Sequence, residues 1–135
     1  MARLRTLAEY IAKLAEYLDQ EVSRGFDLSD FSQLLKFLHV LQMQSKALID
    51  MAQRAAALLG EPTNSYVLAG VVLARRGVFS QEDLKFYRAV VGFRNVVVHG
   101  YLEVDVGRVA GILARREYRR LVDLAMKILG AVGDP

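Results

Sequence analysis

Residues 31–59 form an unbroken helical pattern in which apolar side chains lie on two faces rather than one. The first stripe consists of Phe31, Leu34, Leu38, Leu41, Leu48, Ala52, Ala55 and Leu59, and the second of Phe37, Val40, Ala47, Met51 and Leu58. A surface helix needs only one apolar stripe, because its other face meets water. This segment must therefore pack on several helices of its own chain or bury the second stripe against a partner subunit. The pattern leaves both arrangements open.

Shorter helical patterns flank this long segment. We expect helices at 3–24, 65–76, 80–99 and 114–129, and a short, weaker helical segment after Asp105. The breaks between them contain residues that end or cap helices, namely Gly25, Asp30, Gly60, Pro62, Gly77 and Ser80. No segment alternates as a strand would. The sequence predicts an all-α, up-and-down bundle of five to six helices, in one domain spanning residues 1–135.

Composition excludes several classes of protein. The 135 residues are 53% hydrophobic and include no cysteine, so disulfide frameworks and thiolate metal sites are excluded. No apolar run approaches the roughly 20 residues of a membrane span, and charges begin at Arg3, so we expect a cytoplasmic protein that does not enter a membrane. Glycine-rich phosphate loops and His-Glu-x-x-His are missing from the sequence, so we expect no cofactor and no metal.

Basic residues are concentrated in one part of the chain. Residues 75–120 contain 10 basic and 5 acidic side chains, whereas the rest of the chain contains 8 and 10. Such a block suits a polyanion such as RNA. The candidate RNA-binding residues are Arg75, Arg76, Arg88, Arg115, Arg116 and Arg119. Two other interpretations stay open: Arg75 and Arg76 also suit a helix C-terminus, and the arginines from 115 to 120 could form i,i+4 pairs on a solvated face.

The segment 93–101, Phe-Arg-Asn-Val-Val-Val-His-Gly-Tyr, combines polar and chemically capable groups. Arg94 provides a permanent charge whose planar fork suits phosphate, and histidine is the side chain that ordinarily exchanges a proton near neutral pH. Five helical positions rotate a side chain by about 140°, so Arg94 and His99 cannot share a face of one unbroken helix. Gly100 could end the helix in a left-handed conformation and let His99 turn towards Arg94. Alternatively, His99 could face a second copy of the motif.

These residues resemble the HEPN superfamily, and specifically its HepT-like branch. The resemblance extends over residues 63–125 and rests on Arg94-x-x-x-x-His99-x-Tyr101, with Asn95 after the arginine, Gly-Val-Phe-Ser at 77–80 and Glu-Val-Asp at 103–105. It implies a small all-helical homodimer that cleaves RNA without a metal ion. It also implies a partner, a minimal nucleotidyltransferase encoded beside it as an antitoxin, which attaches AMP to Tyr101.

The expected function follows from the residues together with this resemblance. His99 would transfer a proton as the ribose 2′-hydroxyl attacks the neighbouring phosphate, Arg94 would neutralise the phosphoryl oxygens, and Asn95 would hold the substrate or orient His99. One histidine cannot be base and acid at once, so a dimer that joins two motifs in one cleft would supply the second. The alternative is a helical protein that binds the nucleotidyltransferase and cuts nothing.

Overall fold

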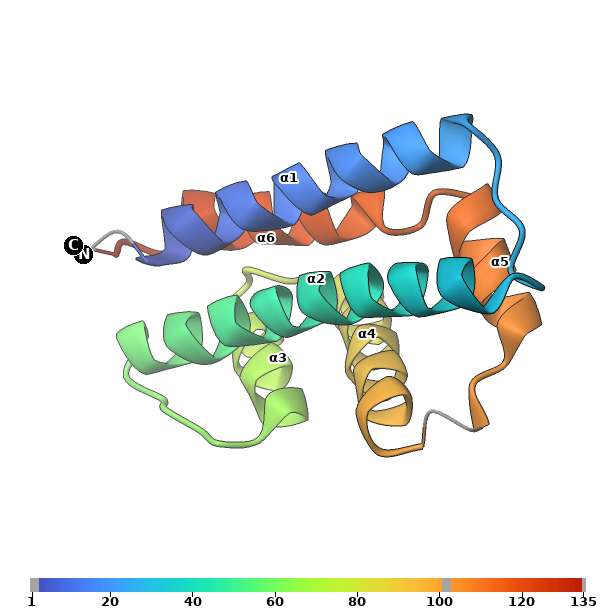
Figure 1. Cartoon of the computed structure of the whole chain (residues 1–135). Coiled ribbons are helices and arrows are strands. Elements are labelled where there is room, and N and C mark those ends of the chain that lie inside the picture. The colour runs from blue at the N-terminus through green and yellow to red at the C-terminus, as the bar shows by residue number, and fades with distance from the viewer. Residues whose placement is uncertain (1–2, 101–102, 135) are drawn as a thin grey trace.

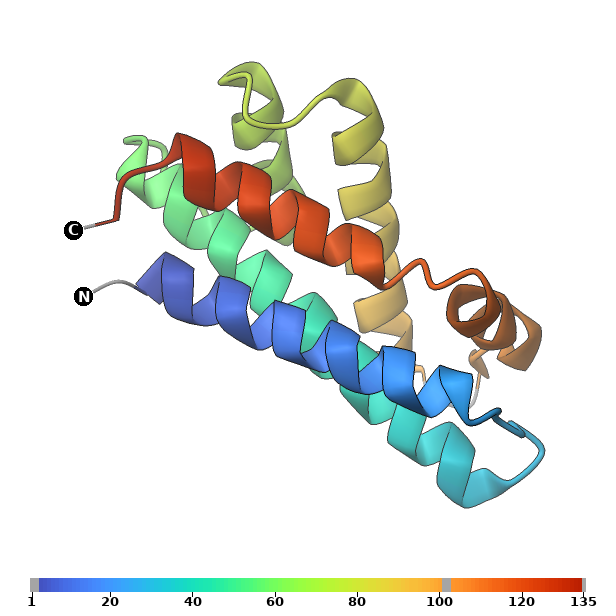
Figure 2. The ribbon, with the colours of Figure 1, turned by 90° about the horizontal axis from the view of Figure 1, so that it is seen from above.

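The computed structural model describes residues 3–100 and 103–134, and these contain six helices. The helices are α1 (Arg3–Ser23), α2 (Phe31–Leu58), α3 (Tyr66–Arg75), α4 (Gln81–His99), α5 (Val106–Ala114) and α6 (Arg119–Ala131). α1, α2 and α6 lie side by side, and α1 runs opposite to the other two (Figure 1). α3 and α4 cross these helices at a steep angle (Figure 2). The prediction of an all-α fold is confirmed, and none of the described helices is long and apolar enough to cross a membrane.

Local sequence signals begin and end the helices where the sequence predicts. The carboxylate of Asp30 accepts hydrogen bonds from the N–H groups of Ser32 (2.9 Å) and Gln33 (3.3 Å), so it caps α2. Ser80 and Asp83 cap α4 reciprocally. Gly60 has φ of +86° where α2 ends, and Glu61 N–H donates back to Ala56 O at 2.9 Å, as in a Schellman motif.

α2 lies at the centre of the molecule, in contact with α1, α3, α4 and α6. Its second stripe is covered within the single chain: Met51 is completely buried, and Phe37, Val40 and Ala47 are at most 7% exposed. Only Leu58 of that stripe is substantially exposed. Most of the second stripe therefore packs on other helices of the same chain, and not on a partner subunit. A charge at Val40 or Met51 would disrupt the chain's own core rather than an interface between subunits.

The last helix differs from its prediction. α6 begins at Arg119 rather than at residue 114, because α5 ends in a Schellman motif: Glu117 N–H donates to Ile112 O at 3.0 Å and Arg116 has φ of +54°. Arg115 and Arg116 thus precede α6, and the expected i,i+4 arginine pairs do not form. A left-handed arginine is uncommon, and here its guanidinium donates to the carboxylate of Asp19 on α1 at 2.8 Å.

Candidate active site

Arg94, Asn95 and His99 all belong to α4, which continues without a break to His99. Gly100 follows with φ of −140°, so the expected left-handed glycine at this helix end is wrong. The Gly100 N–H donates to Val96 O at 2.8 Å, and Gly100 O accepts from Glu103 N–H at 2.8 Å, so ordinary turns end the helix. Because the helix is regular, the five-residue spacing turns Arg94 and His99 about 140° apart. Tyr101 lies outside the described residues.

Arg94 is half-buried and faces the first residue of α3. Its Cζ lies 5.5 Å from the centroid of the Tyr66 ring, a cation–π contact. Its Nε is buried, and the side chain forms no hydrogen bond or ion pair with a described residue. A buried donor without an acceptor costs about 1–3 kcal/mol, which structures seldom tolerate without a functional reason. Arg94 therefore holds an ordered positive charge that is available to an anion.

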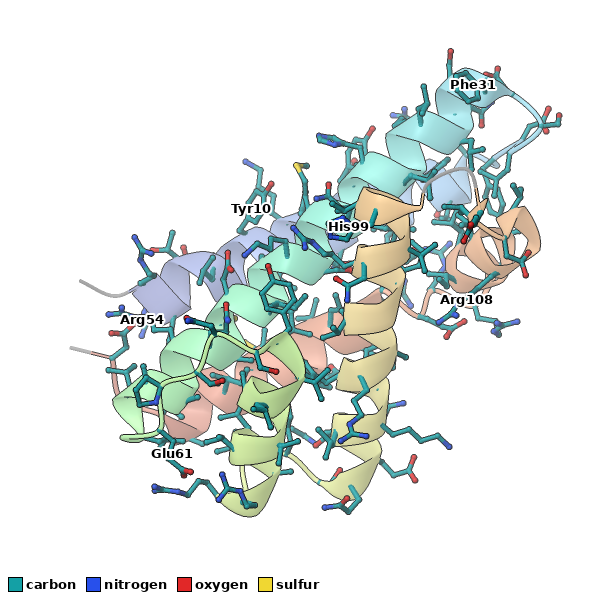
Figure 3. The ribbon with its side chains drawn as sticks, turned by 90° about the horizontal axis from the view of Figure 1, so that it is seen from below. Tyr10, Phe31, Arg54, Glu61, His99 and Arg108 are labelled. Carbon is teal, nitrogen blue, oxygen red and sulfur yellow. The ribbon has the colours of Figure 1, made fainter. Side chains whose placement is uncertain are left out.

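Asn95 and His99 are exposed and lie one helical turn apart, on a face of α4 different from that of Arg94. Figure 3 shows His99 at the end of α4 next to α2, with Arg108 on the opposite side of α4. Of the three valines before His99, Val97 packs into the core, whereas Val96 and Val98 are 44% and 39% exposed. Packing therefore holds this turn through Val97, and the other two valines leave apolar surface beside His99.

Most of the candidate RNA-binding arginines form ion pairs within the chain. Arg75 and Arg76 bind Glu61 at 2.7 and 2.9 Å, at the opposite end of α4 from His99 (Figure 3). Arg116 and Arg119 bind Asp19, and Arg115 binds Glu117. Arg88 is exposed, has no ionic partner within residues 3–100 and 103–134, and lies two turns before Asn95 on the same face. The structure brings Arg88, Asn95 and His99 onto one face of α4 and leaves the other five arginines apart from it.

Sequence reasoning did not identify Tyr66 as part of this site. Tyr66 begins α3, and its carbonyl accepts a hydrogen bond from the hydroxyl of buried Tyr87 at 2.7 Å. The Nζ of Lys46 on α2 also lies 5.3 Å from its ring centroid. No local pattern connects residues 46, 66 and 94, because three helices bring them together.

A comparison with families of known proteins decides where this chain belongs. The profile of the family described as ribonuclease HepT-like matches residues 7–128, which is most of the chain. The chain belongs to the HepT-like family. The resemblance of its sequence is thereby confirmed. No curated protein sequence matches this HepT-like chain.

Solved structures have the same fold as this HepT-like chain. A toxin–antitoxin structure with AMP-PNP aligns with a TM-score of 0.81 and 19% identity, over 93% of this chain and 98% of the other. A tri-AMPylated HEPN toxin of Shewanella oneidensis, in complex with an MNT antitoxin, aligns at 0.80 with 20% identity, over 92% and 96%. A mutant MntA–HpeT toxin–antitoxin structure aligns at 0.78 with 20% identity, over 92% and 97%. At these identities the likeness establishes the HEPN toxin fold.

The described part of this HepT-like chain contains no group of three His, Asp or Glu side chains placed to hold a metal ion. Two acidic residues near the motif in sequence cap helices. Asp105 caps α5 by accepting from Arg108 N–H at 3.2 Å, and Asp83 caps α4. The polar residues of the candidate site on α4 are Arg88, Arg94, Asn95 and His99.

Proposed function

We propose that this HepT-like chain is an endoribonuclease that cleaves RNA without a metal ion and is the toxin of a toxin–antitoxin pair. Membership of a family described as ribonucleases supports RNA cleavage. One observation carries the site assignment. Arg94 is a half-buried cation one turn before the histidine-bearing turn, and its buried Nε has no hydrogen-bond partner among residues 3–100 and 103–134. Such a preorganised donor stabilises charge that develops on a phosphate.

The proposed reaction is an internal transfer. The ribose 2′-oxygen forms a bond to phosphorus as its proton passes to a base, and the bond from phosphorus to the 5′-oxygen breaks as an acid protonates that oxygen. The products are a 2′,3′-cyclic phosphate and a 5′-hydroxyl. His99 carries the proton transfer, Arg94 neutralises the phosphoryl oxygens, and Asn95 holds the substrate or orients His99 from one turn away.

A homodimer completes this site. Arg94 and His99 of one chain are directed about 140° apart by a regular helix, and one histidine cannot serve as base and acid together. A second copy packed against the C-terminal half of α4 would bring both motifs to one cleft. Exposed Val96 and Val98 provide apolar surface for that contact beside His99.

The test is cleavage of labelled RNA by the purified chain in the presence of a chelator. We expect cleavage to continue, products to end in cyclic phosphate, and DNA to remain intact because it lacks the 2′-hydroxyl. Arg94→Ala and His99→Ala should abolish cleavage without loss of helical content. The matched controls are Arg5→Ala and His39→Ala, which remove an exposed arginine from α1 and the other histidine from α2. Activity that disappears with chelator and returns with a divalent ion would overturn the mechanism.

We further propose that a minimal nucleotidyltransferase is the antitoxin and that it attaches AMP to Tyr101. The solved neighbours support this, since one is an AMPylated HEPN toxin with its MNT antitoxin and another contains AMP-PNP. The second candidate function is a protein that binds the nucleotidyltransferase and does not cleave RNA. The same toxin–antitoxin complexes are also consistent with this function. RNA cleavage by the chain alone separates the two: the binder leaves RNA intact, and the toxin does not.

A further inference from the structure

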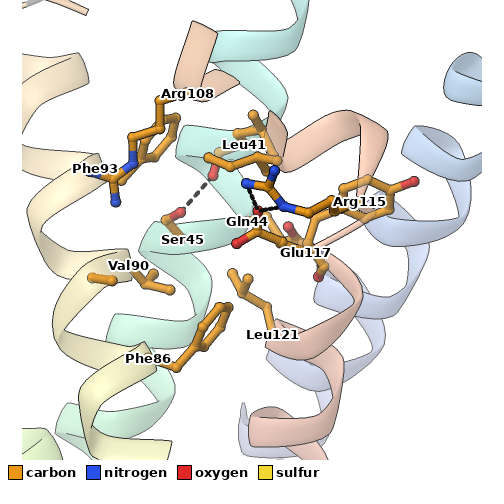
Figure 4. Close-up of a pocket in the computed structure, with 13 residues that line it drawn as sticks. Leu41, Gln44, Ser45, Phe86, Val90, Phe93, Arg108, Arg115, Glu117 and Leu121 are labelled. Carbon is orange, nitrogen blue, oxygen red and sulfur yellow. Dashed lines mark hydrogen bonds and ion pairs between the residues drawn. The ribbon is translucent and has the colours of Figure 1, made fainter. Parts of the chain in front are cut away.

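The two sides of α4 differ in character. Phe86 and Phe93 face inwards, where they line a cavity of about 140 Å³ between α2, α4, α5 and α6 (Figure 4). The other side is exposed to solvent, and we call its six residues the outer track: Gln81, Lys85, Arg88, Gly92, Asn95 and His99. They are spaced three or four positions apart, so all six lie within about 80° of one another around the helix. The outer track thus extends the face of Asn95 and His99 along the whole of α4, over about 27 Å.

The outer track carries positive charge that is not paired within the chain. Lys85 and Arg88 are exposed, and neither forms an ion pair or a side-chain hydrogen bond with any residue in 3–100 or 103–134. The outer track contains no acidic residue and no large apolar one. The core of a protein–protein interface is depleted of charged residues and enriched in aromatic ones, so a polyanion suits this surface better than a second protein.

Gly92 lies in the middle of the outer track, and the chain itself does not require a glycine there. A Cβ atom added at Gly92 would meet no atom within 4 Å, whereas one added at Gly70 of α3 would lie 2.4 Å from the ring of Tyr87. A glycine in a helix interior is less favourable than alanine, and one benefit that offsets this cost is close approach of a ligand to the backbone. Gly92 therefore leaves a notch in which a molecule outside this chain can reach the backbone of α4.

We propose that the outer track binds the RNA strand that extends from the cut bond, with the sugar–phosphate backbone against Gly92 and phosphates paired with Lys85 and Arg88. The inference rests on the proposed function, because it takes His99 as the cut site. Eleven helical positions place Arg88 about 16 Å from His99, which is about five nucleotides of a stacked strand and fewer of an extended one. Contacts to the sugar–phosphate backbone carry no sequence information, so the outer track fixes the path of the strand without reading its bases.

The first experiment measures binding of a labelled 12-nucleotide RNA by fluorescence anisotropy, with the His99→Ala protein so that nothing is cut. Lys85→Ala and Arg88→Ala should each reduce the slope of log K against log salt concentration by about 0.7, the contribution of one phosphate contact on a single strand. Gly92→Gln should weaken binding several-fold because its side chain fills the notch. The same variant should melt a few degrees higher, since glutamine favours a helix, so unfolding cannot explain the loss.

Matched controls come from the exposed positions of α1. Arg5→Ala and Lys13→Ala remove the same kinds of cation, and Ala12→Gln adds the same side chain as Gly92→Gln. None of the three should change the affinity for RNA or its dependence on salt.

The second experiment measures cleavage of DNA strands that contain a single ribonucleotide, so that the cut position is fixed. The strands carry one or eight deoxynucleotides on either side of the ribonucleotide, with each of the four bases at that position. We expect kcat/KM to rise as the flank on one side grows from one to eight nucleotides, because only the longer flank reaches Arg88. This gain should be reduced in Arg88→Ala, Lys85→Ala and Gly92→Gln, and retained in the three α1 controls.

The outcomes separate this inference from the proposed function. If the original chain cuts no substrate, the proposed ribonuclease is refuted, and the binding experiment still decides for or against the outer track. Absence of RNA binding, a salt slope unchanged in both cation variants, or binding that Gly92→Gln leaves intact would overturn the inference. So would a Gly92→Gln protein that is a monomer where the original chain is a dimer, because the notch would then face a second copy.

Discussion

The guanidinium of Arg94 lies over the ring of Tyr66, with Cζ 5.5 Å from the ring centroid. An aromatic face orients a guanidinium without neutralising it, whereas a carboxylate partner would compete with a substrate phosphate for the same charge. The backbone of Tyr66 is fixed in turn, because Tyr87 donates its hydroxyl proton to Tyr66 O at 2.7 Å. Tyr66 is therefore a positioning residue for Arg94.

Replacement of Tyr66 should lower RNA cleavage through the position of Arg94. A cation–π contact is worth about 0.5–2 kcal/mol, so we expect Tyr66→Ala to reduce kcat/KM about 2- to 30-fold. Tyr66→Phe keeps the aromatic face and should retain most of the activity. The measurement is steady-state cleavage of labelled RNA, with circular dichroism to confirm folding. Equal loss in both variants would show that the ring does not act through its face.

Mixing the original chain with an inactive variant tests whether the site is shared between subunits. The proposed reaction uses the histidines of both protomers, so a dimer with one original chain and one His99→Ala chain should be inactive. We expect an equal mixture, unfolded and refolded together, to have about a quarter rather than about half of the activity of the same total amount of the original chain, because only about a quarter of its dimers have both histidines. Light scattering should give the mass of a dimer. A monomeric mass, or a mixture with half of the activity, would contradict a site at a dimer cleft.

Asp19 joins α1 to the turn before α6, and its loss should destabilise the fold. Its carboxylate accepts from Arg116 (2.8 Å), Tyr118 (2.5 Å) and Arg119 (3.0 Å). Burial raises the pKa of Asp19, but these hydrogen bonds outweigh it and lower the pKa overall. We expect Asp19→Asn to reduce the free energy of unfolding by about 1–3 kcal/mol in urea denaturation. The matched control is Asp123→Asn, on an exposed position of α6.

The end of the chain should contribute a stability that depends on acid pH. Arg54 holds Asp134 at 2.6 and 2.8 Å, and Leu4 N–H donates to the same carboxylate at 2.8 Å. The hydrogen bond from Arg54 lowers the pKa of Asp134 to about 2, below the value of about 3.9 for an unfolded aspartate. A depressed folded-state pKa means that the stabilisation is complete above about pH 4 and is lost as pH falls towards 2.

Asp134→Asn should remove this pH dependence, so the stabilities of the variant and the original chain should converge between pH 4 and pH 2. Urea denaturation at several pH values measures the difference. Glu9→Gln, on an exposed position of α1, is the control for loss of a carboxylate. A constant difference across that range would show that the pair makes no pH-dependent contribution.

Tyr101 is the predicted site of AMP attachment. Such a group adds bulk and negative charge two residues after His99, where it would compete with the substrate phosphate for Arg94 and inactivate the enzyme. We expect an AMP adduct in the intact mass after co-expression with the nucleotidyltransferase encoded beside the gene, and none in Tyr101→Phe. An adduct that persists in that variant, or full RNase activity of the modified chain, would refute this role.

The helices themselves follow from local sequence. Asp30, Ser80 and Gly60 begin or end helices where their side chains or backbones predict, because capping requires only neighbouring residues. The Arg94–His99 spacing likewise determines that the two side chains diverge on a regular helix. Family membership was also readable from the sequence, since Arg94, Asn95, His99 and Tyr101 occur together.

Other features were decided by contacts between distant segments. Arg116, in the left-handed turn that ends α5, and Arg119, at the start of α6, both bind Asp19, which lies about a hundred positions earlier in the chain. These ion pairs involve Arg116 and Arg119, which the sequence alone suggested as candidates for RNA binding. Arg94 and Tyr66 meet only because α3 and α4 pack together. Caps and spacings act over one or two helical turns, whereas the partner of a charged or aromatic side chain depends on which helices pack against its own.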